Sequence, residues 1–173
     1  GPASAYELTG TDWTWQPEAV ETAFELDLQS WPSSVGSSSE IDVALTAARN
    51  AWNEAGAEVQ ALDGGSTSSG SWGMDERNVL QYHAGSYGGG TLAVAQYWSA
   101  AGQTYDCDIR FFSENDQGQI TWSSEPAGAA WGEFDIQYVA EHEMGHCLGL
   151  GHSDDPDAVM YAYASSGAGP AQR

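Results

Sequence analysis

Residues 142–152 read HEMGHCLGLGH and carry the strongest chemical signal in the chain. Side chains four positions apart on an α-helix lie on one face, about 5 to 6 Å apart, so His142 and His146 can direct their imidazoles at one ion. Gly149 can adopt the positive φ that reverses a chain at a helix end, and this turn returns His152 to the same point. Three of the four histidines therefore predict a single metal site.

Three neutral imidazoles suit zinc and leave one tetrahedral position for water, which is the arrangement of a catalytic zinc site. Glu143 follows the first histidine, where its carboxylate can take a proton from that water. The predicted chemistry is hydrolysis by a zinc-bound water with Glu143 as the general base. Ordinary helix and core histidines are a poor alternative, because five specified residues at these spacings recur by chance at on the order of 10⁻⁷ per start position.

The flanking sequence predicts two helices. Asp135 is a suitable N-cap for a helix that carries the motif and ends at Gly149. Earlier in the chain, Ser37 and Glu40 have capping-box spacing. A helix that ends at Gly56 follows them, and its apolar positions fall on one face: Ile41, Leu45, Ala48 and Trp52.

Short strands separated by Gly and Ser clusters fill the rest of the chain. They are predicted at Thr22–Leu28, Glu58–Leu62, Asn78–His83, Thr91–Trp98 and Asp106–Phe112, with loops at 31–39, 64–73 and 85–90. About five strands with a backing helix and a late helix that carries the motif make an α+β fold.

The composition fits one globular domain of 173 residues, with 41% hydrophobic and 17% charged residues. The formal charge is −21, because 25 acidic residues stand against 4 arginines. Nucleic acid is not expected as a partner, since the sequence has no cluster of basic residues. Membrane insertion is not expected either, since the sequence has no long apolar run. Solubility, including in salty surroundings, is the main interpretation of the acidity, and a cation-rich site is the alternative.

Two cysteines, Cys107 and Cys147, permit one disulfide. A bridged pair would fit an oxidising compartment, and two buried thiols are the equal alternative.

Residues 142–152, followed by Met160 in the sequence AVMY, resemble the metzincin metallopeptidases, in which HExxHxxGxxH precedes a methionine turn. Ser153 after the third histidine resembles the matrixin branch, which includes the matrix metalloproteinases and their bacterial relatives. The start at 6–10 with Trp13 and the helix start at 135–142 extend this resemblance over most of the chain.

The resemblance implies a twisted mixed sheet, an upper subdomain over 1–152 and a short lower subdomain over 153–173 within a single catalytic domain, 6–173. It also implies one catalytic zinc. Residues 1–5 would be a tag remnant or a flexible segment, and a family helix beyond Arg173 would have been removed.

Residues 89–95 resemble the matrixin edge strand, which holds substrate by main-chain pairing. This resemblance assigns substrate binding to Leu92, Ala93, Val94 and Ala95. Tyr161 and Tyr163 would line the primary pocket or serve as packing residues.

Some positions depart from the family pattern. Val94 and Arg110 occupy positions where animal matrixins place histidines for a structural zinc, so a second zinc is not expected. Asp154, Asp155 and Asp157 form an acidic cluster that could take calcium, but a solvated turn is favoured because EF-hand spacing is missing.

The sequence thus predicts a secreted, monomeric zinc endopeptidase that acts on protein or peptide substrates. An inhibitory propeptide would lie outside these residues. The alternative is a catalytically blocked, zinc-bearing module that only binds peptides. An acidic structural domain without metal is the third interpretation.

Overall fold

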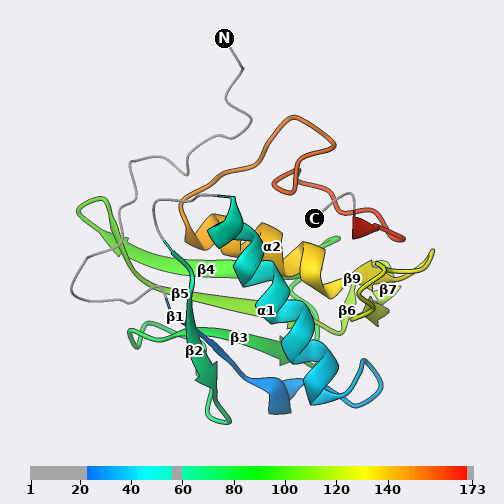
Figure 1. Cartoon of the computed structure of the whole chain (residues 1–173), viewed down its shortest axis with the longest axis horizontal. Coiled ribbons are helices and arrows are strands. Elements are labelled where there is room, and N and C mark those ends of the chain that lie inside the picture. Colours follow the sequence, from blue (N-terminus) through cyan, green and yellow to red (C-terminus); the bar gives the residue numbers. More distant parts are fainter. Residues whose placement is uncertain (1–22, 56–59, 171–173) are drawn as a thin grey trace.

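The computed structural model describes residues 23–55 and 60–170. Helices and strands follow in this order (Figure 1): β1 (Ala23–Leu26), the 3-10 turn η1 (Leu28–Ser30), α1 (Ser38–Glu54), β2 (Leu62–Ser66), β3 (Asn78–His83), β4 (Ala93–Ala100), β5 (Gln103–Phe112), β6 (Glu114–Asn115), β7 (Gly118–Gln119), β8 (Trp122–Ser123), β9 (Phe134–Asp135) and α2 (Ile136–Cys147).

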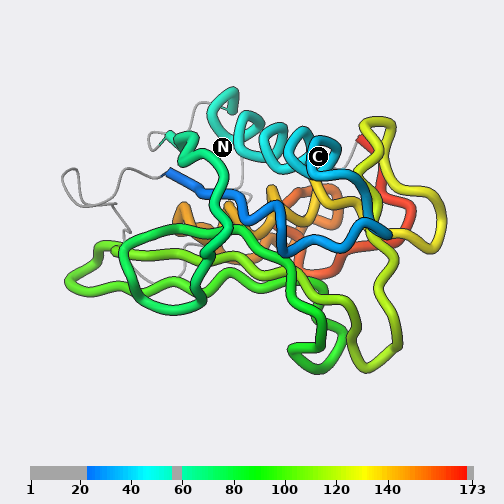
Figure 2. Tube along the Cα trace, turned by 90° about the horizontal axis from the view of Figure 1, so that it is seen from below, coloured from blue at the N-terminus to red at the C-terminus, as the bar shows by residue number. Residues whose placement is uncertain are grey.

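The main sheet has five strands in the order β2-β1-β3-β5-β4. Its first four strands run parallel, and β4 pairs antiparallel with β5 at the sheet edge. Both helices lie on the same face of this sheet (Figures 1 and 2). The predicted α+β fold with a mixed sheet of about five strands is confirmed.

Helix α1 follows its sequence signals closely. The side chain of Ser37 accepts from Glu40 N while the Glu40 carboxylate accepts from Ser37 N, so the predicted capping box is confirmed. Ile41, Leu45 and Ala48 are fully buried. This face packs against α2, which places the motif helix between α1 and the sheet edge.

The strand predicted at Glu58–Leu62 lies too early in the chain, and only its last residue, Leu62, is in a strand of the structure. Residues 56–59 lie outside the described part of the chain, and β2 begins only at Leu62. It continues through Gly64, within a segment predicted as loop. A Cβ built at Gly64 would lie 2.9 Å from the Phe24 backbone, so the close approach of β1 requires glycine. All five residues of β2 are exposed, which leaves no apolar alternation to detect.

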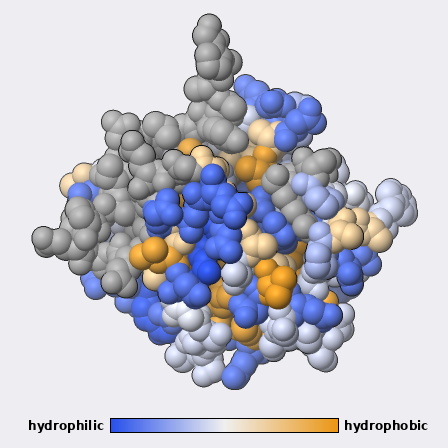
Figure 3. All heavy atoms as spheres, viewed as in Figure 1, coloured by the Kyte–Doolittle hydropathy of each residue, from blue (hydrophilic) through white to orange (hydrophobic). Residues whose placement is uncertain are grey.

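The predicted tag remnant at 1–5 and the family-like start at 6–10 with Trp13 lie outside the described residues. Neither described helix has the length and apolar character needed to span a membrane. Figure 3 shows hydrophilic residues spread over the face seen in Figure 1, with hydrophobic residues in small separate patches.

Candidate active site

The two ends of α2 are built by local sequence signals. At its start, Asp135 Oδ1 accepts from Tyr138 N at 2.9 Å, which confirms the predicted N-cap. At its end, Gly149 has a φ of 95°, and the amides of Gly149 and Leu150 donate to His146 O and Gly145 O. This double hydrogen bond is a Schellman motif, which reverses the chain directly before His152.

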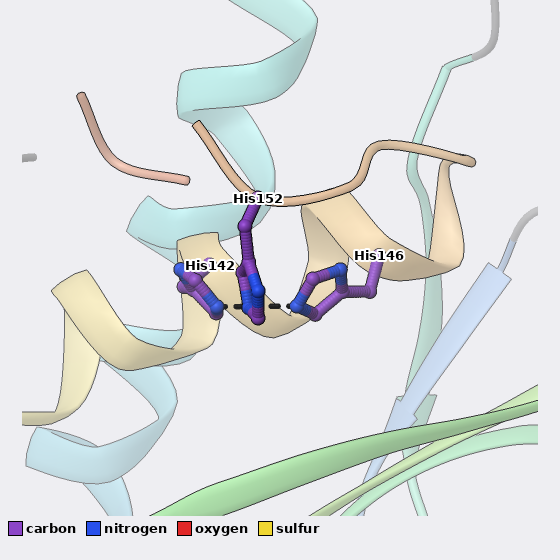
Figure 4. Close-up of side chains that lie close together, drawn as sticks. All are labelled: His142, His146 and His152. Atoms are coloured by element: carbon purple, nitrogen blue, oxygen red, sulfur yellow. Dashed lines mark hydrogen bonds between the residues drawn. The ribbon is translucent and has the colours of Figure 1, made fainter. Parts of the chain in front are cut away.

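Three imidazoles converge at this turn (Figure 4). His142 and His146 project from α2 and His152 from the following loop, and their rings point toward one another. One ligand atom from each histidine lies within 4.8 Å of the others. Within the described residues, this is the one group of three or more His, Cys, Asp or Glu side chains that could hold a metal ion.

Backbone carbonyls fix the orientation of the two helical imidazoles. His142 Nδ1 lies 2.8 Å from Val159 O, and His146 Nδ1 lies 2.8 Å from Leu150 O. A carbonyl only accepts hydrogen bonds, so each Nδ1 carries the proton and each Nε2 presents a lone pair. This is the tautomer that a metal needs when it binds through Nε2.

The two lone pairs face each other, since His142 Nε2 lies 3.1 Å from His146 Nε2. Two neutral acceptors at this distance repel unless a cation lies beside them. Two nitrogens on one tetrahedral zinc at about 2.0 to 2.1 Å would be about 3.3 Å apart. The residues present therefore fit zinc in both donor type and spacing.

Burial lowers the pKa of both helical imidazoles and so favours their neutral forms. It lowers the pKa of His142 to about 4, although the hydrogen bond to the Val159 carbonyl favours the charged ring and so raises this pKa. Burial likewise lowers the pKa of His146. Neutral imidazoles are the form that binds metal, so the lowered pKa favours metal binding over protonation at both positions.

Glu143 lies beside the histidines and is only 7% exposed. Burial raises its pKa to about 8, and a hydrogen bond from the Ala95 amide opposes that rise. The bond to Ala95 ties the carboxylate to the edge strand β4. A bound cation would lower this pKa by favouring the charged form.

Met160 is fully buried, and the turn that contains it is hydrogen-bonded to His142 and to the residue after His152. The residue before it, Val159, accepts from His142, and Met160 O accepts from Ser153 N at 2.8 Å. Because Ser153 follows His152 directly, this turn fixes a histidine of the helix and a histidine of the loop together.

A cleft of about 610 Å³ opens in front of the histidines. Its lining contains all the residues predicted for substrate binding: Leu92, Ala93, Val94, Ala95, Tyr161 and Tyr163. Phe134, Tyr138, Asn115 and Gln117 also line it and were not predicted. Asn115 and Gln117 belong to the short β6–β7 hairpin, whose two-residue strands are too short to show a pattern in the sequence.

The main-chain groups of β4 alternate between the sheet and the cleft. Leu92 O accepts from Phe112 N, so Leu92 and Val94 direct their main-chain groups toward β5. Ala93 and Ala95 then direct theirs to the open side, where the Ala95 amide meets Glu143. Among the described strands, only β5 pairs with β4.

A family model described as matrixin matches residues 4–171. The chain belongs to the matrixin family. The resemblance seen in residues 142–153 and Met160 is thereby confirmed, and the three converging imidazoles are the feature of this matrixin that fits the zinc of the family.

Shorter segments of this matrixin are similar to named peptidases. The chain is 38% identical to karilysin of Tannerella forsythia over 74 residues, 43% of its own length and 14% of that protein. It is 40% identical to human neutrophil collagenase over 60 residues, 35% of its length and 11% of that protein. Human matrilysin is 60% identical over 30 residues, 17% of the chain and 11% of that protein. The matched segments thus span a small part of each relative.

The structure also gives the positions of the two cysteines, of Val94 and Arg110, and of the acidic residues after His152. Cys107 and Cys147 are joined in a disulfide. Val94 and Arg110 are paired across β4 and β5, and the Arg110 guanidinium lies 4.1 Å from the centre of the Trp72 ring. Three acidic residues after His152 are exposed: Asp154, Asp155 and Asp157. Among the described residues they are not part of a group that could hold a metal ion, so the calcium alternative gains no support.

Proposed function

We propose that this chain is a zinc-dependent endopeptidase. The observation that carries the proposal is the convergence of three imidazoles, two of them in the Nε2 lone-pair tautomer, beside a buried carboxylate at the wall of a 610 Å³ cleft. His142, His146 and His152 would hold the ion. When bound, zinc supplies Lewis-acid polarisation of a peptide carbonyl and of water.

Glu143 is the proposed proton carrier. Its carboxylate takes a proton from the attacking water and delivers it to the amine that leaves when the peptide bond breaks. The Ala95 amide orients one carboxylate oxygen, and the buried surroundings favour the protonated carboxyl after the first transfer. A group that must accept and then release a proton near neutral pH benefits from this balance.

The edge strand β4 would bind the substrate main chain. Ala93 directs its amide and carbonyl to the open side of the sheet, where an extended peptide can add as a further strand. Tyr161 and Tyr163 also line the cleft, with ring centres 5.8 Å apart, and would form the wall opposite the edge strand. The matrixin resemblance implies a preference for an apolar substrate side chain next to the cleaved bond, and Leu92, Phe134 and Val139 supply apolar surface in the cleft.

Secretion is part of the proposal. The Cys107–Cys147 disulfide supports an oxidising compartment, since such bridges are rare in the cytosol.

The decisive experiment compares Glu143→Gln with the unchanged chain in a fluorogenic-peptide assay. Loss of the proton carrier should lower kcat by at least about 10²-fold while zinc content stays near one per chain. Glu54→Gln, at the exposed end of α1, is the matched control and should leave kcat unchanged. Undiminished hydrolysis by the Glu143 variant would exclude this role.

The alternative of a blocked module that only binds peptides predicts a different result. Such a protein would bind peptides at the cleft with zinc present and never cleave them, with or without a chelator. Cleavage that disappears on chelation and returns with added zinc would exclude it.

A further inference from the structure

Trp52, in the last turn of α1, contacts α2 at two points, and each contact precedes a proposed zinc ligand. Its indole Nε1 donates to Glu141 O at 2.8 Å, and Glu141 directly precedes His142. Its ring also lies against Gly145, which directly precedes His146: a Cβ built there would be 2.9 Å from Trp52 Cζ2. One side chain of α1 thus fixes the backbone of α2 before both helical histidines.

Met160 packs against the same residue of α2, Gly145. The same Cβ at Gly145 would overlap Met160 Sδ, so the glycine lies between an indole and a thioether. Glycine inside a helix is unfavourable on its own, and the two close neighbours are the physical reason for it here. Trp52 and Met160 together clamp α2 at the level of its two histidines.

The indole hydrogen bond is specific for the position of α2. A helix carbonyl has two lone pairs, of which the helix itself uses one, and the indole takes the other. Trp52 is half-buried, and a rotation or slide of α2 that moved Glu141 O would break this hydrogen bond. The bond therefore fixes α2 in one register against α1.

We propose that Trp52 is a positioning residue of the zinc centre: it sets the rotation and depth of α2 so that His142 and His146 converge on the ion. In this role Trp52 acts on the ligands through the backbone of α2. The inference rests on the zinc site of the proposed function. Removing groups that orient zinc ligands typically weakens metal binding by 10- to 100-fold, and we expect about tenfold here because Trp52 acts through the backbone.

The test compares Trp52→Phe with Trp122→Phe in the full chain. Trp122 is a matched control, because its buried Nε1 also donates to a backbone carbonyl, Phe112 O, at 2.8 Å, and this carbonyl is not part of α2. Zinc dissociation constants come from competition with a chelator. Unfolding by urea, with zinc removed, reports the stability of each variant.

We expect the Trp52 variant to bind zinc about tenfold more weakly and the Trp122 variant to bind within about twofold of the unchanged chain. The visible absorption of the Co²⁺-loaded chain should change in the Trp52 variant alone, because it reports ligand geometry. Equal losses of zinc affinity in both variants would assign Trp52 a merely structural role and overturn the inference.

A second substitution covers failure of Trp52→Phe to fold. Benzothienylalanine at position 52 keeps the shape of the indole and removes only the N–H donor, so it tests the bond to Glu141 O directly. Unchanged zinc affinity and an unchanged Co²⁺ spectrum would overturn the inference. A parent chain that bound no zinc would instead defeat the proposed function.

Discussion

Cys147 is the last residue of α2 and directly follows His146, and its disulfide to Cys107 ties this end of the helix to the middle of β5. The bridge closes a loop with a sequence separation of 40 residues. Trp52 holds α2 from the side of α1, so the helix with the histidines is fastened to both of its neighbours.

The disulfide predicts a large effect on stability. Replacing both cysteines with alanine should lower the free energy of unfolding by roughly 3 to 4 kcal/mol, the amount that chain entropy gives for a loop of this length. Urea unfolding of the double variant measures it. Cys107 and Cys147 are 0% and 1% exposed, so a reductant should release their thiols in the native protein only slowly, and quickly after addition of denaturant. Rapid release without denaturant would contradict the buried position.

Gly145→Ala tests the close contact of α2 with Trp52 and Met160. The added methyl group would overlap Met160 Sδ and approach Trp52 Cζ2, and both neighbours are held in place, so we expect a loss of about 1 to 3 kcal/mol despite the better helix propensity of alanine. Gly90→Ala is the control, since its Cβ would meet only Gln117 Nε2 at 3.6 Å. A Gly145 variant as stable as the Gly90 variant would show that α2 has room to move.

Metal removal gives a direct test of the three histidines. The chain should contain about one zinc, and excess zinc should raise its melting temperature, because a ligand that binds only the folded state stabilises it. His146→Ala should weaken zinc binding by more than about 100-fold, since it removes a ligand itself and not a group that orients one. His83→Ala, an exposed residue at the end of β3, should retain the zinc. Equal zinc content in both variants would contradict the site.

The sequence could predict those parts of the molecule that depend on side chains close together in the chain. The capping box at Ser37, the N-cap at Asp135 and the turn at Gly149 each need only a few consecutive residues, and all three are found. The position of strand β2 was mispredicted because Gly64 is required by the close approach of Phe24, a residue far away in the sequence.

The same reasoning explains what was missed at the site. The histidine spacing indicates the ligands, but the group that holds His142 is a carbonyl 17 residues away. Every residue type carries such a carbonyl, so no sequence pattern marks it. The bond from Trp52 spans 89 residues and also ends on a carbonyl, which is why this tryptophan was interpreted only as part of an apolar helix face.

The pKa of His142 predicts how the stability of the metal-free protein changes with pH. Burial lowers this pKa from 6.5 to about 4. Between these values the unfolded chain binds a proton that the folded protein does not bind, so the contribution of His142 to stability is complete above pH 6.5 and is lost as the pH falls toward 4. Asp108 acts in the opposite direction, because burial raises its pKa to about 7, and its contribution is lost as the pH rises through the same range. The contribution of His142 is separated from that of Asp108 by comparing the unchanged chain with His142→Gln, which keeps Asp108. The free energy of unfolding of both is measured with urea at pH 4.5 and 6.5. The stability advantage of the unchanged chain over the variant should be larger at pH 6.5, and an advantage that stayed constant or shrank would show that the imidazole is not buried in its neutral form.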